Sequence, residues 1–273
     1  YALIEVVKAG CDIIIQNYDI TKSINTIERA VFDGIISEER INQSALKMLN
    51  MKEKLGLHRS FEVSLDQMQQ NLSHADHKVM AKKIASESIT CVVNDNRLIP
   101  MQHDLVWYVI DLYDNENNHT LSSVTKGLKT SGVNVKSFQV DVSDSEEVLM
   151  EIVKEIPKES HVLINTFVGY RARKDRISLP DNLSNFIHII TKRTSNLILG
   201  SLGNPYIIQD FPQIQSYLCA YKNNSLMKNA YLEALLGKRK INGKLPVSIP
   251  GIARIGEGVS VNKIEMKKNI VKH

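Results

Sequence analysis

Two acidic residues near the end of an apolar run are the first candidates for chemistry. Asp111 and Asp114 bracket the end of a strand expected at residues 105–112, where an acidic side chain can meet a bound ligand. The letters that follow, Asp-Asn-Glu-Asn-Asn, are also typical of a turn, because short polar side chains bond to nearby backbone. We therefore interpret the pair first as turn residues and second as a site.

A histidine pair offers a different chemistry. His74 and His77 lie three residues apart at the start of a predicted helix, so both imidazoles can reach one metal ion. No third ligand with suitable spacing is apparent, and Asp76 between them is typical of a solvated first helical turn. The sequence therefore predicts no metal site.

A basic cluster follows the strand expected at residues 161–167. Its members are Arg171, Arg173, Lys174 and Arg176, and a loop of this kind can grip an anionic saccharide. A solvated loop, or one paired with acidic groups elsewhere, is the simpler interpretation. Arg171 and Arg173 are kept as candidate substrate-binding residues.

The stretch NLILGSLGNPY, residues 196–206, holds the best local candidate. Its apolar run stops at Gly200, which is typical of a buried strand whose following loop lies at the ligand-binding edge of an α/β sheet. Gly203 permits a positive φ and the next proline fixes φ, so Asn204 and Tyr206 should point in fixed directions. We expect a structural turn first, and saccharide contact by Asn204 and Tyr206 as the alternative.

Alternating strand and helix patterns predict the scaffold that carries these loops. Strands are expected at residues 89–93, 105–112, 133–140, 161–167, 196–200 and 217–220, and helices at 75–87, 121–130, 145–156, 183–191 and 225–236. Strands separated by helices of this length indicate parallel pairing with both faces covered. The predicted fold class is α/β, with residues 75–250 forming a three-layer αβα sandwich around a mainly parallel sheet.

The first 57 residues show the pattern of an incomplete domain. A helix ending at Gly10, a strand at residues 11–15, a helix capped by Thr21 or Ser23, and a helix from Ser37 to Gly56 are expected. A single strand cannot form a domain, so residues 1–57 look like the end of a larger α/β domain. Residues 58–74 read as a polar linker, and residues 251–273 as a polar, basic tail.

Composition narrows the class of protein. The 273 residues are 43% hydrophobic and 23% charged, which favours a folded chain. A charge of +4, spread out apart from short basic runs at residues 171–176 and 238–240, argues against nucleic-acid binding. Cys11, Cys91 and Cys219 are far apart and are expected to be buried thiols. No apolar stretch approaches the ~20 residues of a membrane span.

Several segments together resemble glycoside hydrolase family 3. AGCDIIIQ and residues 23–57 are similar to the last strand and closing helices of that family's (β/α)8 barrel, and residues 77–101 are similar to the start of its C-terminal domain. GNPY at 203–206, FP at 211–212, AY at 220–221 and GKLPVSIPG at 243–251 complete the match. The resemblance runs in order over nearly the whole chain.

The branch resembled is the β-N-acetylhexosaminidases, which remove N-acetylglucosamine from peptidoglycan fragments or chitooligosaccharides. The resemblance implies a barrel remnant at residues 1–57, no cofactor, and a location outside the cytoplasm. It also places the Asp nucleophile and the His-Asp acid/base in barrel loops upstream of Tyr1. Retaining glycosidases need such groups about 5 Å apart, and no motif here supplies them. The chain alone is therefore expected to be inactive, with saccharide bound through the missing barrel.

Two other functions stay open from the sequence. The sandwich can act as a non-catalytic scaffold or as a weak carbohydrate-binding module. A nucleotide-binding Rossmann domain is disfavoured, because no G-x-G-x-x-G follows the first sandwich strand.

Overall fold

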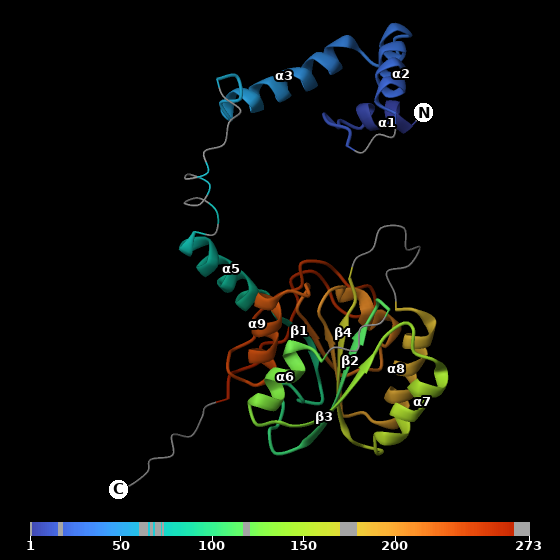
Figure 1. Cartoon of the computed structure of the whole chain (residues 1–273), viewed down its shortest axis with the longest axis vertical. Helices are drawn as coiled ribbons and strands as arrows, with labels where there is room; N and C mark the ends of the chain where they lie inside the picture. The colour runs from blue at the N-terminus through green and yellow to red at the C-terminus, as the bar shows by residue number, and fades with distance from the viewer. Residues whose placement is uncertain are drawn as a thin grey trace. The chain divides into compact units, whose positions relative to one another are not determined.

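The structure is a computed structural model, and it describes residues 2–15, 19–59, 65, 68, 72, 74–116, 121–169 and 179–264. The chain divides into two compact units, Tyr1–His74 and Ala75–His273. Each unit is described by itself below (Figure 1). Of the helices in these ranges, none combines the length and apolarity that a membrane crossing needs.

The first unit contains the helices α1 (Ala2–Lys8), α2 (Ile20–Phe32) and α3 (Glu38–Lys54). The Ser37 hydroxyl accepts a hydrogen bond from Arg40 N at 3.2 Å and so caps α3 as predicted. The cap expected for α2 at Thr21 or Ser23 was wrong. Asp19 begins this helix instead, because its carboxylate accepts a hydrogen bond from Lys22 N at 2.9 Å.

The predicted strand at residues 11–15 is not a strand in the structure. A strand requires a neighbour for its backbone hydrogen bonds, and the described part of this unit contains no strand. Asp12 is instead tied to α3 through its side chain. Cys11 is exposed, so the expectation that all three cysteines are buried was wrong for this one.

The core of the first unit is small. Among its described residues, the buried apolar side chains of this core are Val7, Ala30 and Ile36. Large apolar side chains elsewhere in the unit face solvent, including Phe32 at 90% and Leu49 at 61% exposure. Leu49, although apolar and on α3, is therefore not part of this core.

The second unit is an α/β sandwich around one six-stranded sheet. Its strands are β1 (Thr90–Asn94), β2 (Val106–Tyr113), β3 (Asn134–Val140), β4 (His161–Phe167), β5 (Leu197–Ser201) and β6 (Ser216–Cys219), in the order β1-β6-β5-β4-β2-β3. The pairs from β6 to β3 are parallel, and β1 runs antiparallel to β6. The mainly parallel sheet predicted from the alternating pattern is confirmed.

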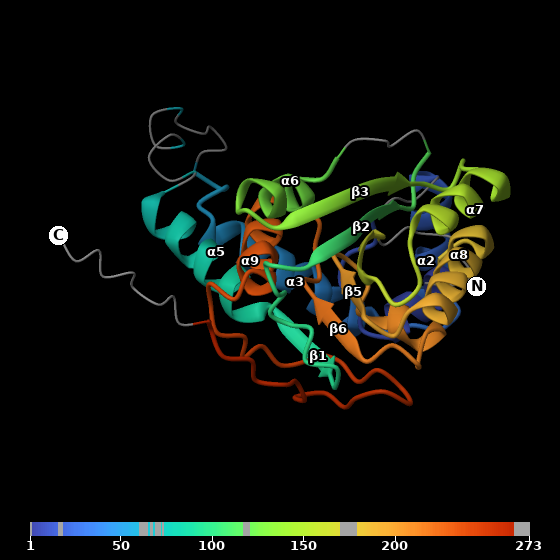
Figure 2. The ribbon, with the colours of Figure 1, turned by 90° about the horizontal axis from the view of Figure 1, so that it is seen from below.

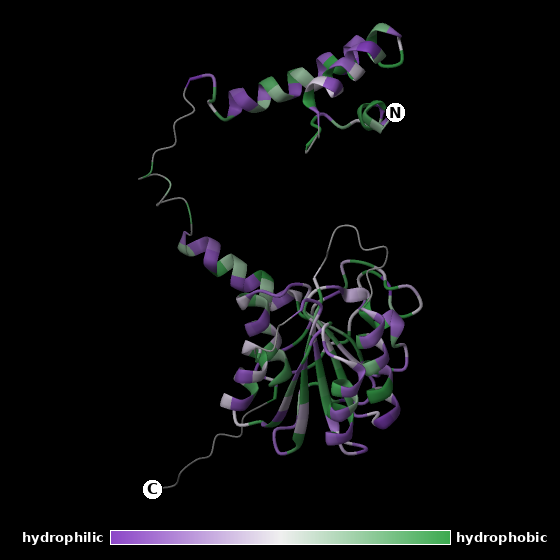
Figure 3. Cartoon of the chain, turned by 45° about the vertical axis from the view of Figure 1, so that its right-hand side comes forward, coloured by the Kyte–Doolittle hydropathy of each residue, from purple (hydrophilic) through white to green (hydrophobic). Residues whose placement is uncertain are grey.

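Helices cover both faces of the sheet (Figure 2). The helices are α5 (Ala75–Ser88), α6 (Ser123–Thr130), α7 (Glu146–Glu155), α8 (Asp181–Arg193) and α9 (Ser225–Leu235), with the 3-10 helix η1 (Pro205–Asp210). Buried side chains of α5, α6 and α9 share one core, and those of α7, α8 and η1 share the other. The strands carry the apolar colour and the outer helix faces the polar one (Figure 3).

Strand β2 shows why two cores form. Trp107 and Val109 belong to the core under α6 and α9, whereas Tyr108 and Ile110 belong to the core under α7 and α8. Successive side chains of a strand point to opposite faces, so a central strand buried on both sides must be apolar throughout. Asp111 breaks this rule in the same strand.

The two edges of the sheet differ. On the outer side of β1, Val259 N donates a hydrogen bond to Cys91 O at 2.7 Å, and the two residues form an antiparallel bridge. At the other end of the order, β3 pairs with β2 alone. Its Lys136 ammonium lies 5.3 Å from the centre of the Tyr108 ring.

Candidate functional site

The strand order places a topological switch point beside β2. The chain passes from β2 to β3 on one side and then returns to β4 on the other side of β2. In open α/β sheets, ligands bind in the crevice outside the carboxyl ends of strands at such a point. The segments that follow β2, β4 and β5 are therefore where a site is expected.

A buried polar network lies at this point. Asp111 of β2 and Asn165 of β4 are register partners, both are fully buried, and Asn165 Nδ2 donates to Asp111 Oδ1 at 2.9 Å. Asp111 Oδ2 accepts from Ser122 N at 2.9 Å, and both carboxylate oxygens lie 2.8 Å from Thr125 Oγ1. The carboxylate therefore joins two strands to the beginning of α6.

The network continues to α9 through a tyrosine. Tyr231 OH donates to Asn165 Oδ1 at 2.9 Å, and its ring is fully buried. Burial and the Asp111 charge raise the pKa of Tyr231 well above its ordinary value, so the phenol is neutral. Every oxygen of the Asp111 carboxylate is engaged, which suits a structural charge rather than a catalytic acid.

The interpretation of Asp111 as a turn residue was wrong. It lies inside β2, and its partners are 11 to 54 positions away in the sequence. Asp114 does follow the strand, in a bend, and is buried. The signal that could have found the network is a polar residue at matching places in two apolar strands, Asp111 and Asn165.

The Gly203 turn after β5 packs closely on the end of β4. A Cβ at Gly203 would overlap Val168 O and lie 3.0 Å from Val168 C. Leu202 N also donates to Thr166 O at 2.9 Å. Gly203 is thus needed for close approach of two backbones, and the positive φ considered from the sequence is not the reason.

Asn204 and Tyr206 are held by the turn itself. Asn204 Oδ1 accepts from Tyr206 N at 2.9 Å and caps η1, and Asn204 O accepts from Ser201 Oγ at 2.6 Å. Tyr206 is half-buried and packs on the core under α7 and α8. The side chain of Asn204 serves the fold, and contact of either residue with saccharide stays a prediction.

Arg171 and Arg173, with Lys174 and Arg176, lie outside the described residues. The described chain leaves β4 at Phe167 and reaches Gly169 beside the Gly203 turn. In the sequence, Arg171 and Arg173 follow β4, and Asn204 and Tyr206 follow β5. These two strands are neighbours in the sheet.

The histidine pair lies on the surface. His74 and His77 are exposed, at the beginning of α5. In the described ranges, no group of three His, Cys, Asp or Glu side chains is arranged to hold a metal ion.

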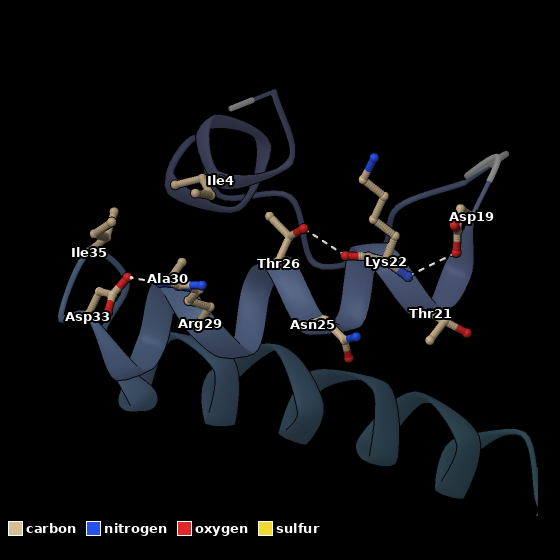
Figure 4. A pocket seen from close by; sticks show the side chains of 10 residues that line it. All are labelled: Ile4, Asp19, Thr21, Lys22, Asn25, Thr26, Arg29, Ala30, Asp33 and Ile35. Atoms are coloured by element: carbon tan, nitrogen blue, oxygen red, sulfur yellow. Dashed lines mark hydrogen bonds and ion pairs between the residues drawn. The ribbon is translucent and has the colours of Figure 1, made fainter.

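The first unit has a shallow groove of about 530 Å³ between α1 and α2 (Figure 4). Asp19 and Asp33 mark the two ends of α2 there, and Lys22 and Arg29 lie between them. A helix of this length separates its ends by roughly 20 Å, far more than a retaining carboxylate pair allows. The groove therefore carries mixed charge without a catalytic pair.

A second charged site in the same unit is built around Asp12. Its carboxylate accepts from Ser44 Oγ at 2.7 Å, from Lys47 Nζ at 2.9 Å and from Arg40 Nη1 at 3.1 Å. The hydrogen bonds from Ser44 and Lys47 lower the pKa of Asp12 to about 2. This carboxylate is fixed as an anion and anchors residues 11–15 to α3.

Comparison with known proteins addresses the family resemblance. No family model matches the chain. A Cellulomonas fimi protein described as a beta-N-acetylglucosaminidase/beta-glucosidase is 21% identical over 272 residues, which cover 90% of this chain and 45% of that protein. The chain thus spans about half the length of this curated relative.

Solved structures give the same picture for the fold. A beta-glucoside phosphorylase is 22% identical with a TM-score of 0.64, over 91% of this chain and 45% of that one. A glycoside hydrolase family 3 beta-N-acetylglucosaminidase from a Paenibacillus species is 21% identical with a TM-score of 0.62, over 90% and 47%. A beta-glucosidase from Listeria innocua has a TM-score of 0.61 at 16% identity, over 91% and 37%.

The chain matches the C-terminal portion of glycoside hydrolase family 3 proteins. The resemblance inferred from the motifs is confirmed, and so is the α/β fold of the family's C-terminal domain. The names of these family 3 relatives include both N-acetylglucosaminidases and glucosidases, so the family match alone does not select a sugar.

Proposed function

We propose that this chain is the C-terminal part of a retaining exo-β-N-acetylglucosaminidase that acts on peptidoglycan fragments or chitooligosaccharides. The observation that carries the proposal is the match of nearly the whole chain to the Cellulomonas fimi protein, whose description includes beta-N-acetylglucosaminidase. The nucleophile and acid/base are proposed to come from a further protein segment.

The surroundings of two carboxylates, Asp111 and Asp12, support the proposal that the catalytic groups come from another segment. Asp111 is fully buried and bonded on both oxygens, and Asp12 is paired with Arg40 and Lys47. Neither is available to attack a sugar or to protonate a leaving group, since both tasks need an accessible oxygen at the scissile bond.

The apolar surface of the first unit supports it as well. Ile15 is 81% exposed, Phe32 is 90% exposed and Leu49 is 61% exposed, whereas the core formed by the described residues of this unit has three buried apolar side chains. Exposed apolar side chains that form one contiguous patch mark a surface that another protein segment covers. We propose that the segment carrying the catalytic groups packs here.

The first test is hydrolysis by the purified chain. We expect no release of nitrophenol from a chromogenic β-N-acetylglucosaminide, with the intact Cellulomonas fimi relative as the positive control. Turnover by residues 1–273 at a comparable rate would contradict the absence of catalytic groups.

The second test concerns the sugar. If the reading frame extends upstream of Tyr1, its longer product should cleave the β-N-acetylglucosaminide faster than the matching β-glucoside. The reverse preference would overturn the proposed substrate and favour a β-glucosidase.

The alternative is a scaffold or a weak carbohydrate-binding module. The observation that favours a scaffold is that the Asn204 side chain caps η1 within its own turn. Calorimetric titration of the chain with N-acetylglucosamine oligomers separates the two, because a scaffold gives no binding heat.

A further inference from the structure

A charged cavity of about 350 Å³ lies between α5 and α9. Lys82 and Ser86 line it from α5, and Asn229 and Glu233 line it from α9. Arg239, the central residue of the basic run at 238–240, completes the polar wall. Neither the family match nor the proposed function uses this run.

The guanidinium of Arg239 has a buried hydrogen-bond donor that is not satisfied by the described residues. Its side chain is only 20% exposed, and one terminal nitrogen, Nη2, donates to Ser86 Oγ. The buried Nε has no hydrogen-bond acceptor among the described residues; it forms an ion pair with Glu233, whose oxygen at 3.8 Å is too far for a hydrogen bond. Leaving a buried donor unsatisfied is unfavourable, and a ligand oxygen would satisfy it.

The charges around the cavity favour an anion. Lys82 and Arg239 are both positive, whereas Glu233 is the one acidic residue in the described lining. Lys82 makes no ion pair within the described ranges. Lys238 and Lys240 flank Arg239 in sequence and add to the local positive potential.

The remaining lining limits the size and kind of ligand. Leu226 and Ala230 give an apolar wall, and Asn229 supplies an amide that can both donate and accept. The cavity lies within the size range of small-molecule sites. Its composition fits an organic molecule that carries one oxyanion and a neutral polar or apolar body.

We propose that the α5–α9 cavity binds a small organic anion, a carboxylate or a phosphate monoester, through Arg239 and Lys82. Arg239 Nε–H donates to a ligand oxygen, and the Lys82 ammonium neutralises its charge. The proposal does not depend on the glycosidase activity, because the groups involved are all in this unit.

The test is calorimetric titration of the full chain with three probes of similar size at low salt. Glucuronate presents a carboxylate, glucose 6-phosphate presents a phosphate, and glucose is the neutral control. We expect one anion to bind and glucose to give no heat, and the anion that binds identifies the oxyanion. Equal binding of glucose, or no binding of either anion, would overturn the proposal.

Variants test the two cations separately. Arg239→Gln and Lys82→Met should each weaken binding of the preferred anion by about tenfold or more, since charge-assisted hydrogen bonds are the strong ones. Lys83→Met, a charge change on the same helix outside the cavity lining, should leave affinity unchanged.

If Arg239→Gln lowers the melting temperature, Arg239→Lys provides the test, because it keeps the charge and loses the guanidinium donors. If Lys82→Met and a folded Arg239 variant both bind the anion with unchanged affinity, the proposed site is contradicted.

Discussion

The phenolic oxygen of Tyr231, on α9, occupies the space that a Cβ on Gly200 of β5 would need. The absence of a side chain at this strand position lets the tyrosine lie across the sheet and reach Asn165. Asn165 in turn bonds to Asp111, so the glycine makes room for the whole buried polar network.

Gly200→Ala should destabilise the second unit. The added methyl would overlap Tyr231 OH and lie 2.7 Å from Cζ, and a fully buried ring has little room to move. Overpacking of this kind costs typically ~1–3 kcal/mol, measured by urea unfolding. Gly169→Ala is the matched control, because a Cβ there meets nothing within 4 Å. A loss in Gly200→Ala no larger than in the control would contradict the packing argument.

Gly203→Val should lower the melting temperature further than Gly203→Ala. Any Cβ here overlaps the carbonyl of Val168, and backbone cannot turn aside as a side chain can. A branched side chain adds bulk at the same point, so the two loops must separate. An unchanged melting temperature in the valine variant would show that the turn does not hold β5 to β4.

Asp111→Ala should cost more than Tyr231→Phe. The first change leaves Ser122 N, Thr125 Oγ1 and Asn165 Nδ2 without their acceptor, at about 2–4 kcal/mol. The second removes one hydrogen bond, at about 1 kcal/mol. Chemical denaturation of the two variants checks the order, and the reverse order would mean that the carboxylate is not the centre of the network.

The Asp12 carboxylate should titrate with a midpoint near pH 2 in carbon NMR. Its folded pKa of about 2 is below the ordinary value, so its stabilising contribution is present above about pH 4 and is lost as the pH falls toward 2. Ser44→Ala removes the leading cause and should raise the midpoint. A midpoint near 4 in the unmodified chain would show that the contacts of Asp12 do not form.

One of the three cysteines should react with iodoacetamide in the native chain. Cys11 is exposed, whereas burial raises the pKa of both Cys91 and Cys219 to about 12. Only a thiolate attacks the reagent, so the buried pair is slow for two reasons. Mass spectrometry should find one adduct at pH 8 and three in denaturant. Native labelling of Cys219 would indicate that β6 opens.

The sequence predicted those parts of the fold that depend on near neighbours. Apolar runs placed all six strands of the second unit to within a few residues, and the helix expected from Ser37 begins there, with Ser37 as its cap. The prediction of a strand at residues 11–15 was wrong because a strand forms only beside a second strand that takes up its backbone hydrogen bonds. The apolar residues of this segment indicate burial, but in the described part of the first unit they are not buried.

The candidate site was harder to predict because its contacts are distant in sequence. The residues that follow Asp111 in the sequence indicate a turn, but its carboxylate accepts a hydrogen bond from Asn165, 54 positions away. Gly203 was recognised as special for its possible φ, yet the residue that requires it is Val168, on another loop. Neither relationship is visible until the strands are placed side by side.

The bridge between Val259 and Cys91 has a consequence for assembly. Because this contact covers part of the outer side of β1, near the beginning of the strand, the outer side of β3 is the less covered edge of the described sheet. An added strand is therefore expected at β3, on the side opposite to its pairing with β2.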